Sequence, residues 1–298
     1  MPLSLSVRSV SGMKVAFAGL GVMGFPMAGH LAKAGHEVAV YNRSPEKARR
    51  WAETFGGKAA ASAAEAAKGA EVLALCVGND DDVRQVVAQA LPAMAPGGVI
   101  VDHTTTSAQV AREMADLARQ SGRAFVDAPV SGGQAGAEAG QLTIMCGGDP
   151  EAFAKVEPVI AAYAKATKLM GPPGSGQLTK MVNQICFTNV VQGLAEGLHF
   201  ARRAGLDPQA VYDAISKGAA QSWQMDNRWK TMSEGKFDFG FAVDWVLKDL
   251  GLVLDEARRN GATLTQTEML EGFYREVQAM GGGRWDTSSL IARLETPR

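Results

Sequence analysis

The stretches Lys14-Val-Ala-Phe-Ala18, Gly19-Leu-Gly-Val-Met-Gly24 and Glu37-Val-Ala-Val-Tyr41 decide the fold of the first half of this chain. Residues 14–18 form a short apolar run that stops at a glycine, which predicts a buried strand. Residues 27–34 are rich in alanine and precede Gly35, a typical helix stop, and residues 37–41 predict a second strand. A strand, a glycine-rich turn, a helix and a strand within about 30 residues are typical of a βαβ unit.

The turn after the first strand has the spacing Gly-x-Gly-x-x-Gly. We expect Gly19 to permit the tight turn, Gly21 to let a pyrophosphate approach the backbone, and Gly24 to let helix and strand pack closely. Free N–H groups at the start of the helix favour an anion there. The alternative is a tight turn that binds nothing. The predicted cofactor contacts in this turn are Gly19, Gly21, Val22, Met23 and Gly24.

The end of the second predicted strand indicates which dinucleotide the chain prefers. Proteins that bind NAD usually place Asp or Glu there, to accept a hydrogen bond from the ribose 2′-hydroxyl. This chain has Tyr41-Asn42-Arg43-Ser44, without an acid. Arg43 can pair with a 2′-phosphate and stack on the adenine. We therefore predict NADP(H) over NAD(H), with Asn42 and Arg43 as contacts. The alternative for Arg43 is a solvated loop residue.

The rest of the chain divides into an α/β half and a helical half. Further strands are predicted at residues 71–77, 99–103 and 124–130, with alanine-rich helical stretches between the earlier ones, which indicates a mainly parallel, doubly wound sheet. A breaker cluster, Gly171-Pro-Pro-Gly-Ser-Gly176, follows. Residues 177–203 then predict one long helix, and strand-like runs nearly vanish. The expected parts are an N-terminal arm, a dinucleotide-binding domain and an all-helical domain, at residues 1–12, 13–174 and 175–298.

A second glycine-rich segment, residues 127–140, follows the last predicted strand. Open α/β sheets bind ligands at the carboxyl ends of their strands. Ser131 supplies a hydroxyl group there, and Gly132 and Gly133 can present backbone N–H groups to a small anion such as a carboxylate. We therefore predict a site for a substrate carboxylate at these three residues. The alternative is a flexible connection.

The long helix carries a lysine and two amides close to its start. Lys180 and Gln184 are four residues apart, so they share one face of the helix, and Asn183 borders that face. A lysine can carry a proton to or from a reacting oxygen. The Gln184 amide can hold the substrate oxygen or orient the lysine. The alternative for Lys180 is a solvated surface residue, as most lysines are.

The overall composition argues against several classes of protein. The chain has 30 Lys and Arg residues and 31 Asp and Glu residues, which leaves no basic excess for nucleic acid or an anionic membrane. The three cysteines are far apart, which fits a reducing compartment and argues against a disulfide framework. No apolar run is long enough to span a membrane, and the N-terminus does not have the pattern of a signal peptide. We expect a cytoplasmic protein that binds neither nucleic acid nor membranes.

A metal site is not predicted either. The histidines at 30, 36, 103 and 199 are scattered, without the spacing of a metal site or a catalytic relay, and we interpret each of them as structural. The acidic run Asp80-Asp-Asp82 resembles a metal-binding cluster at first sight. The better interpretation is a solvated helix start, where acidic side chains suit the helix dipole.

Taken together, these motifs resemble the β-hydroxyacid dehydrogenase family, which includes 3-hydroxyisobutyrate dehydrogenase, tartronate semialdehyde reductase and the glyoxylate and succinic semialdehyde reductases. The resemblance runs from Lys14 to about Leu294 and rests on several separated motifs in the expected order. It implies an N-terminal Rossmann domain, a long inter-domain helix and an all-helical C-terminal domain. Because that second domain commonly mediates assembly in relatives, we expect a homodimer or homotetramer.

The resemblance also implies further cofactor contacts. Val77-Gly78-Asn79 is similar to the family's loop over the cofactor, where many relatives have Pro in place of Gly78. Thr105 falls on the family's cofactor-contacting threonine. Lys248 falls on a lysine that approaches the cofactor in the family. These matches add Val77, Thr105 and Lys248 to the predicted cofactor-binding residues.

For the substrate site, Lys180 matches the family's catalytic lysine, and Ser131-Gly132-Gly133 resembles its substrate-carboxylate loop. Gln184 is Asn in many members. Gln appears in the tartronate semialdehyde reductase-like branch, so this departure leaves the mechanism intact. It makes the identity of the substrate less certain to infer from the resemblance. The C-terminal matches are Phe241 and Asp249, which line the family's catalytic cleft, and Asp286-Thr-Ser288, an element without an assigned role.

These matches imply an NADP(H)-dependent reductase or dehydrogenase of small 3-hydroxy acids and their semialdehydes, with Lys180 as general acid and base. The expected substrates are small carboxylates of the 3-hydroxyisobutyrate, tartronate semialdehyde, glyoxylate or succinic semialdehyde type. One alternative is an imine reductase, which shares the fold, although a lysine at position 180 favours carbonyl chemistry. Another is a non-catalytic NADP-binding module, which we would expect to have lost that lysine.

Overall fold

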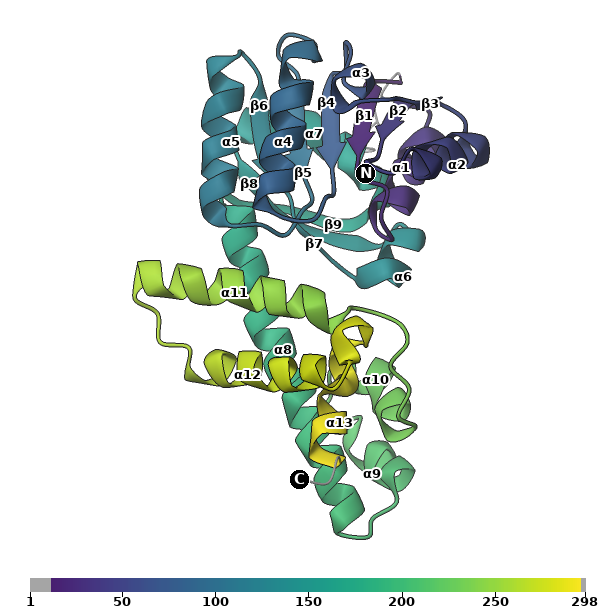
Figure 1. Ribbon diagram of the computed structural model, residues 1–298, viewed down its shortest axis with the longest axis vertical. Helices are drawn as coiled ribbons and strands as arrows, with labels where there is room; N and C mark the ends of the chain where they lie inside the picture. Colours follow the sequence, from purple (N-terminus) through teal and green to yellow (C-terminus); the bar gives the residue numbers. More distant parts are fainter. Residues whose placement is uncertain (1–11, 296–298) are drawn as a thin grey trace, which may run out of the picture. The chain divides into compact units, whose positions relative to one another are not determined.

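The computed structural model describes residues 12–295, and the chain divides into two units, residues 1–180 and 181–298. Each unit has a hydrophobic core of its own. The expected N-terminal arm lies, apart from Gly12, outside the described residues. Figure 1 labels the elements of both units.

The first unit is built on a nine-stranded sheet with the order β3-β2-β1-β4-β5-β6-β8-β7, in which β9 pairs with β8. Every pairing from β3 across to β6 is parallel. This confirms the predicted mainly parallel, doubly wound α/β fold. The strands are β1 (Lys14–Ala18), β2 (Glu37–Tyr41), β3 (Lys58–Ala59), β4 (Val72–Leu75), β5 (Val99–Asp102), β6 (Ala124–Asp127), β7 (Val130–Ser131), β8 (Leu142–Gly148) and β9 (Ala164–Gly171).

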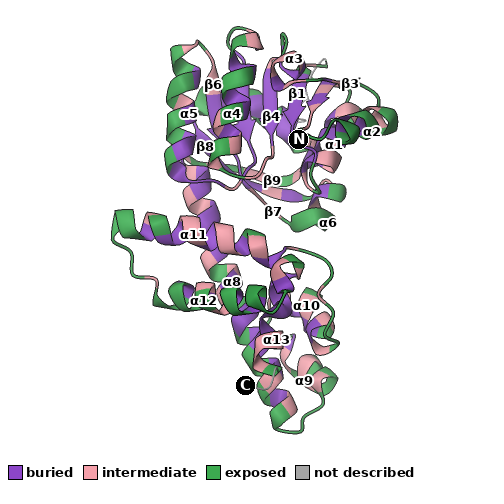
Figure 2. Ribbon diagram, viewed as in Figure 1, coloured by how far each residue is buried: buried purple, intermediate pink, exposed green. Residues whose placement is uncertain are grey.

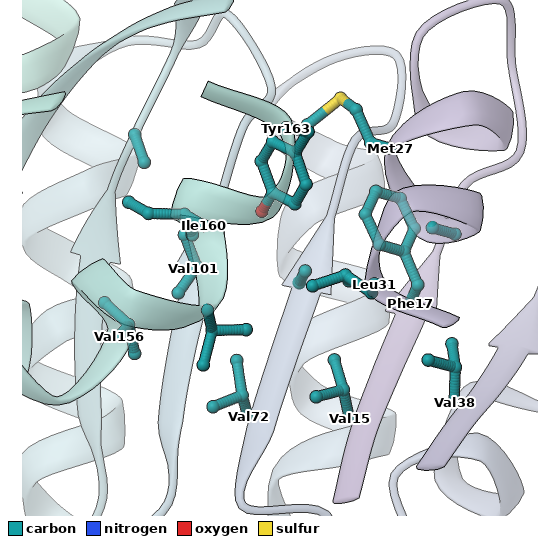
Figure 3. Close-up of a cluster of buried hydrophobic side chains, with 14 of the residues drawn as sticks. Val15, Phe17, Met27, Leu31, Val38, Val72, Val101, Val156, Ile160 and Tyr163 are labelled. Atoms are coloured by element: carbon teal, nitrogen blue, oxygen red, sulfur yellow. The ribbon is translucent and has the colours of Figure 1, made fainter. Parts of the chain in front are cut away.

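Helices bury both faces of this sheet. Val15 and Phe17 of β1 belong to one core cluster, whereas Ala16 and Ala18 belong to another, because successive side chains of a strand point to opposite faces. Figure 3 shows the first cluster, with Phe17 beside Met27 and Leu31 of α1, and with Val156 and Ile160 of α7 farther along the sheet. Sheets covered on both faces need such continuous apolar strands. The helices are α1 (Gly24–Lys33), α2 (Pro45–Phe55), α3 (Ala63–Ala66), α4 (Asp80–Ala90), α5 (Ala108–Gln120), α6 (Gly133–Glu138) and α7 (Pro150–Ile160).

The predicted strand at residues 124–130 is wrong in its second half. The chain leaves the parallel ladder after Asp127, since Pro129 has no N–H group to donate to it. Val130–Ser131 then pairs with β8 in the antiparallel direction. The strands predicted at 71–77 and 99–103 are also longer than the observed β4 and β5, and the helix predicted to start at residue 27 already starts at Gly24.

Within residues 181–295 the regular elements of the second unit are helices joined by loops, apart from an isolated bridge between Ala242 and Asp286. Its core contains apolar side chains from α8 and α10 to α13, and Figure 2 colours parts of these helices as buried. The long helix predicted at 177–203 is confirmed and starts two residues earlier. The helices are α8 (Ser175–Arg203), α9 (Pro208–Ile215), α10 (Trp223–Ser233), α11 (Val243–Asn260), α12 (Thr265–Ala279) and α13 (Leu290–Glu295). No helix within residues 12–295 has both the length and the apolar character needed to cross a membrane.

Candidate functional site

The glycine turn after β1 is shaped by close backbone contacts. A Cβ atom on Gly24 would lie 1.9 Å from the carbonyl oxygen of Gly19, so α1 can begin this close to β1 only with glycine at position 24. At Gly21, by contrast, a Cβ would meet nothing within 4 Å. The N–H group of Leu20 donates to Asn42 Oδ1 at 2.8 Å and joins the turn to the end of β2. This arrangement fits a pyrophosphate lying against the open backbone at Gly21 and the start of α1.

Arg43 is an exposed side chain that reaches toward the start of α4. Its Nη1 atom lies 3.4 Å from Asp82 Oδ1, and its side chain is 87% exposed. The other carboxylate oxygen of Asp82 accepts the N–H group of Gly78 at 3.2 Å. The pair therefore connects Arg43 to the predicted cofactor loop. An ion pair this exposed contributes about 1 kcal/mol or less, so Arg43 can exchange Asp82 for an incoming phosphate at little cost.

The segment Thr104–Thr106 after β5 is held from two sides. Val77 donates its N–H group to Thr104 Oγ1 at 3.0 Å. The side chain of Gln177, at the start of α8, donates through Nε2 to the carbonyl oxygen of Thr104 at 2.7 Å. Its Oε1 atom accepts the N–H group of Thr106 at 3.0 Å. Thr105, a predicted cofactor contact, therefore lies between two anchored residues.

The acidic run at residues 80–82 opens α4, as expected for a helix start. The expectation that these acids are all solvated is wrong for Asp80, because its carboxylate accepts from the backbone N–H of Ser107 at 3.0 Å and from its hydroxyl at 2.5 Å. Asp80 thereby ties α4 to the start of α5. Within residues 12–295, no group of three or more His, Cys, Asp or Glu side chains is placed to hold a metal ion.

The glycine-rich segment at 127–140 contains the end of β6, the short strand β7 and the helix α6. Ser131 ends β7 and is half-buried, while Gly132 and Gly133 are exposed. Gly132 has a φ of +129° and Gly133 a φ of +60°, conformations that favour glycine. The chain then forms α6. The segment therefore presents the two predicted glycine N–H donors in a backbone geometry that most other residues do not adopt.

Lys180 lies on the second turn of α8 and is only 8% exposed. The alternative of a solvated surface lysine is therefore wrong. Gln184 follows one turn later on the same face and is 2% exposed. A lysine shielded from water in this way is suited to proton transfer with a bound substrate rather than with solvent.

Sequence reasoning missed Asp127, the last residue of β6. Its carboxylate is buried and accepts two backbone N–H groups from the start of the lysine helix, those of Gly174 at 2.7 Å and Gln177 at 2.9 Å. Burial raises the pKa of Asp127 to about 6, against the lowering effect of these hydrogen bonds. The signal for it was an acid at the end of an apolar strand, since a buried carboxylate must find donors.

His103 has the structural role expected of it. Its ring nitrogens lie 2.7 Å from the carbonyl oxygen of Ala128 and 2.8 Å from the hydroxyl of Tyr163. Burial lowers the pKa of His103 to about 4, so the ring is neutral near pH 7. The neighbouring Asp102 is also fully buried, and burial raises its pKa to about 7. Both residues belong to the packing behind the ends of β5 and β6.

In the second unit, four predicted residues form one chain of polar contacts. Gln184 donates through Nε2 to Asp249 Oδ2 at 2.6 Å, and its Oε1 atom accepts from Asn183 Nδ2 at 2.9 Å. The other oxygen of Asp249 lies 3.2 Å from Lys248 Nζ. The structure thus brings together residues from α8 and α11 that lie about sixty positions apart. Asp249 is 4% exposed, so its charge is compensated by these partners.

Phe241, the remaining predicted residue, is held by the C-terminal element. Its N–H group donates to Asp286 Oδ2 at 3.0 Å, and the other carboxylate oxygen lies 3.0 Å from Arg228 Nε. The Phe241 ring packs on Phe187, with ring centroids 6.2 Å apart. Ser288 adds a hydroxyl donor to Asp286 at 2.6 Å. These contacts give Asp286-Thr-Ser288 a structural role, which is to hold the loop that carries Phe241.

The second unit also has an apolar pocket of about 320 Å³ between α8, α9 and α10, lined by residues such as Val190, Leu194 and Trp229. Its lining contains none of the predicted site residues. It offers hydrophobic surface and no charged group for a carboxylate, so we do not place the substrate there.

Two family models match nearly the whole chain. Residues 14–171 match the NAD binding domain of 6-phosphogluconate dehydrogenase, and residues 174–294 match the NAD-binding domain of NADP-dependent 3-hydroxyisobutyrate dehydrogenase. Together with the glycine turn, they define a class, the oxidoreductases that bind a nicotinamide dinucleotide.

Similar proteins narrow this class. The chain is 62% identical over 288 residues to an uncharacterized oxidoreductase of Shewanella frigidimarina, covering 96% of this chain and 99% of that protein. It is 32% identical over 286 residues to 2-hydroxy-3-oxopropionate reductase of Escherichia coli, covering 95% and 97%. The structure of Mycobacterium tuberculosis 3-hydroxyisobutyrate dehydrogenase with L-serine matches with a TM-score of 0.89 and 30% identity, over 96% of this chain and 100% of that one. The chain belongs to the β-hydroxyacid dehydrogenase family, which confirms the resemblance noted from its motifs.

Proposed function

We propose that the chain is an NADP(H)-dependent reductase or dehydrogenase that interconverts a small 3-hydroxy acid and its semialdehyde, or reduces glyoxylate or succinic semialdehyde. The observation that carries this proposal is Lys180, a buried lysine one turn into a helix whose start is fixed by Asp127 and Gln177. The names of the E. coli and M. tuberculosis relatives support the substrate class, because both denote chemistry on a carbon next to a carboxylate-bearing centre.

In this proposal the chain's own groups bind, orient and protonate the substrate. Ser131 and the N–H groups of Gly132 and Gly133 hold the carboxylate. Lys180 donates a proton to the carbonyl oxygen as the carbon is reduced, and takes that proton back in the oxidative direction. Gln184 and Asn183 steady the reacting oxygen, and Phe241 and Asp249 line the substrate pocket. NADP(H), when bound, supplies or accepts the hydride.

We further propose that NADP(H) is preferred and that NAD(H) is also accepted. The absence of an acid after β2 and the exposed guanidinium of Arg43 support this preference. The second matching family model belongs to an NADP-dependent 3-hydroxyisobutyrate dehydrogenase, which supports the preference as well. The residues proposed to hold the cofactor are the glycine turn at 19–24, Asn42, Arg43, Val77, Thr105 and Lys248.

The test is Lys180→Ala, assayed by NADPH oxidation with glyoxylate, succinic semialdehyde, methylmalonate semialdehyde and tartronate semialdehyde. We expect kcat to fall by at least about 100-fold, because general acid–base catalysis contributes that much. NADPH binding, followed by fluorescence, should be unchanged. Lys168→Ala, at an exposed lysine of β9, is the matched control. Near-normal turnover of the Lys180 variant would contradict the proposal.

The imine reductase alternative is not favoured. The matching family models and the named relatives indicate hydroxyacid chemistry, and Lys180 is a proton donor suited to a carbonyl oxygen. Cyclic imines belong in the same screen, where their turnover without turnover of any semialdehyde would reverse this preference. A non-catalytic NADP-binding module would bind NADPH and turn over nothing in the screen.

A further inference from the structure

We infer that Asp127 and Gln177 are positioning residues that together set the lysine helix against two loops at the ends of β5 and β6. Neither belongs to the predicted site. The inference rests on the roles proposed above for Lys180, Thr105 and Ser131, and the experiments below separate its failure from theirs.

We call the hydrogen bonds that Asp127 and Gln177 make at the start of α8 the joint. The carboxylate of Asp127 is its first half. It accepts the N–H groups of Gly174 and Gln177, at 2.7 and 2.9 Å, with one oxygen each. These donors belong to the backbone that enters α8, so one side chain fixes the start of the helix. In sequence Asp127 lies four residues before Ser131, at the end of β6. The same residue therefore belongs to the strand that leads into the carboxylate loop and holds the helix that carries Lys180.

The start of α8 packs tightly against the backbone around Asp127. A Cβ atom on Gly176, in the first turn of α8, would lie 2.4 Å from the carbonyl oxygen of Met145 and 2.6 Å from that of Asp127. A Cβ on Gly147 would lie 2.6 Å from Asp127 Oδ1. The first turn thus packs directly on the backbone of β6 and β8. Interiors packed this tightly have discrete arrangements and do not slide continuously.

The side chain of Gln177 is the second half of the joint. It is completely buried, and its amide bonds both the carbonyl oxygen of Thr104 and the N–H group of Thr106. The backbone N–H of this same residue donates to Asp127. One residue in the first turn of α8 therefore links the loop with Thr105 to the carboxylate at the end of β6.

The joint sets the position of Lys180. It follows Gln177 by three residues in an uninterrupted helix, so the rigid helical backbone transmits the placement of the first turn directly to it. A displacement of about 1 Å at a reacting group can lower a rate by about 100-fold. A shift of the first turn would therefore reach Lys180 without any contact between Asp127 and the substrate.

A merely structural role for Asp127 predicts something different, and Asp149 provides the matched control. Asp149 caps α7 in the same unit by accepting the N–H groups of Glu151 and Ala152, at 2.8 and 3.4 Å. No proposed site residue lies on α7. Asp127→Asn and Asp149→Asn make the same chemical change at two helix starts, so a difference between their kcat values reports on the helix that follows.

The first experiment measures kcat for NADPH oxidation with the semialdehyde that the wild type reduces fastest. We expect Asp127→Asn to lower kcat by about 30-fold or more, and Asp149→Asn to change it by less than about 2-fold. In a Lys180→Ala background, Asp127→Asn should cost no more than about 3-fold further, since residues that act through one another are not additive. An equal loss in both backgrounds would overturn the inference. Full activity of Lys180→Ala alone would overturn the proposed function and, with it, the inference.

Gln177→Met provides a second, independent test, which stands even if Asp127→Asn does not fold. Methionine has a similar shape but cannot bond Thr104 and Thr106. We expect the KM for NADPH to rise by about 10-fold, together with a smaller fall in kcat, because the loop with Thr105 loses its anchor. Thermal unfolding measured alongside shows whether the variant is folded. Unchanged KM and kcat in a folded Gln177→Met protein would overturn the inference.

Discussion

Arg43 is the residue on which the proposed cofactor preference depends. Its guanidinium is exposed and pairs with Asp82, so it is available to a 2′-phosphate. We expect Arg43→Ala to lower kcat/KM for NADPH by about 10-fold to 100-fold, the value of one charge-assisted contact of 1.5–3 kcal/mol. The value for NADH should change by less than about 3-fold. Steady-state kinetics with both cofactors provide the measurement.

The control for this prediction is Arg49→Ala. Arg49 is an exposed arginine on the neighbouring α2, paired with Glu46, and its removal takes away the same charge at a position away from the turn. If Arg43→Ala lowered kcat/KM equally for NADPH and NADH, Arg43 would not recognise the 2′-phosphate. The same conclusion would follow if Arg43→Ala and Arg49→Ala lowered kcat/KM for NADPH equally.

Asp102 makes the stability of the fold depend on pH. Burial raises its pKa from 3.8 to about 7, and its Oδ2 atom has no hydrogen-bond partner within residues 12–295. The carboxyl group of Asp102 therefore binds its proton more tightly in the folded protein than in the unfolded chain. The resulting stabilisation is complete below about pH 4 and is lost as the pH rises through about 7. We expect the free energy of unfolding of the wild type, relative to Asp102→Asn, to fall by about 1 kcal/mol per pH unit across this window.

His103 changes the free energy of unfolding with pH in the opposite direction, so its contribution must be separated from the contribution of Asp102. Because burial lowers its pKa from 6.5 to about 4, the stability that it contributes is present above pH 6.5 and is lost as the pH falls toward 4. Taking the difference between wild type and variant in urea unfolding at each pH cancels this contribution. Asp81→Asn, at an exposed carboxylate, should give a flat difference. A flat difference for Asp102→Asn as well would contradict the prediction.

At the scale of elements, the loop before α11 depends on an ion pair that is largely shielded from water. Asp286 accepts from the backbone of Phe241 and pairs with Arg228, whose guanidinium lies over the rings of Trp223 and Phe239. Removing one partner of a buried pair costs about 3–5 kcal/mol, because the other charge is left uncompensated. We expect Asp286→Asn to lower the melting temperature and to raise the substrate KM by about 10-fold, with the KM for NADPH unchanged.

Thermal unfolding and steady-state kinetics check that prediction, with Glu276→Gln as the control. Glu276 pairs with Arg293 within the same unit, and its side chain is 53% exposed, so we expect little change in either measurement. If Asp286→Asn lowered the melting temperature but left the substrate KM at its wild-type value, the loop would be important for folding only.

The elements that the sequence predicted well are those whose signal is local. The βαβ unit at the N-terminus follows from an apolar run, three spaced glycines and a second apolar run, and β1 and β2 appear at the predicted residues. The α8 helix follows from a long stretch without proline. β8 and β9 were not predicted, because β8 ends in two glycines and β9 carries exposed lysines at positions 165 and 168. Their pairing is a long-range property of the sheet.

The same division holds for the candidate site. The glycine turn has a recognisable spacing, Lys180 and Gln184 share one face of a predicted helix and also match the family, and Asp249 was predicted from the resemblance alone. Asp127 and Gln177 have no motif of their own, since what distinguishes them is burial beside donors and acceptors from distant segments. The acid at the end of an apolar strand indicates a buried carboxylate that needs donors, but only the folded chain shows that these donors come from the start of α8.

At the scale of the whole molecule, we predict a homodimer or homotetramer. The α8 helix exposes Val182, Val190 and Phe200, with Phe200 71% exposed, and apolar side chains gathered on one helix are typical of an interface. Light scattering should give a mass of two or four chains of 31.4 kDa. Phe200→Glu should shift the population toward the monomer, whereas Lys168→Ala should not. A monomeric wild type at micromolar concentration would contradict this prediction.

The predicted boundary between residues 174 and 175 remains a proposal. The two family models meet between residues 171 and 174, and α8 begins at Ser175. The two structural units, however, divide after Lys180, inside that helix. We propose that α8 is shared by the two domains, with its first turn fixed by Asp127 as part of the dinucleotide-binding domain.

Lys180 and Gln184 lie one turn apart on α8, which is continuous from Ser175 to Arg203. The helical backbone sets their separation, and no contact between the two side chains is needed to maintain it. An exchange between Asn and Gln at position 184 can therefore change which molecules the enzyme accepts, while the proposed proton donor stays where it is. With the roles proposed above, evolution can change the substrate through position 184 while the acid–base group at position 180 is retained.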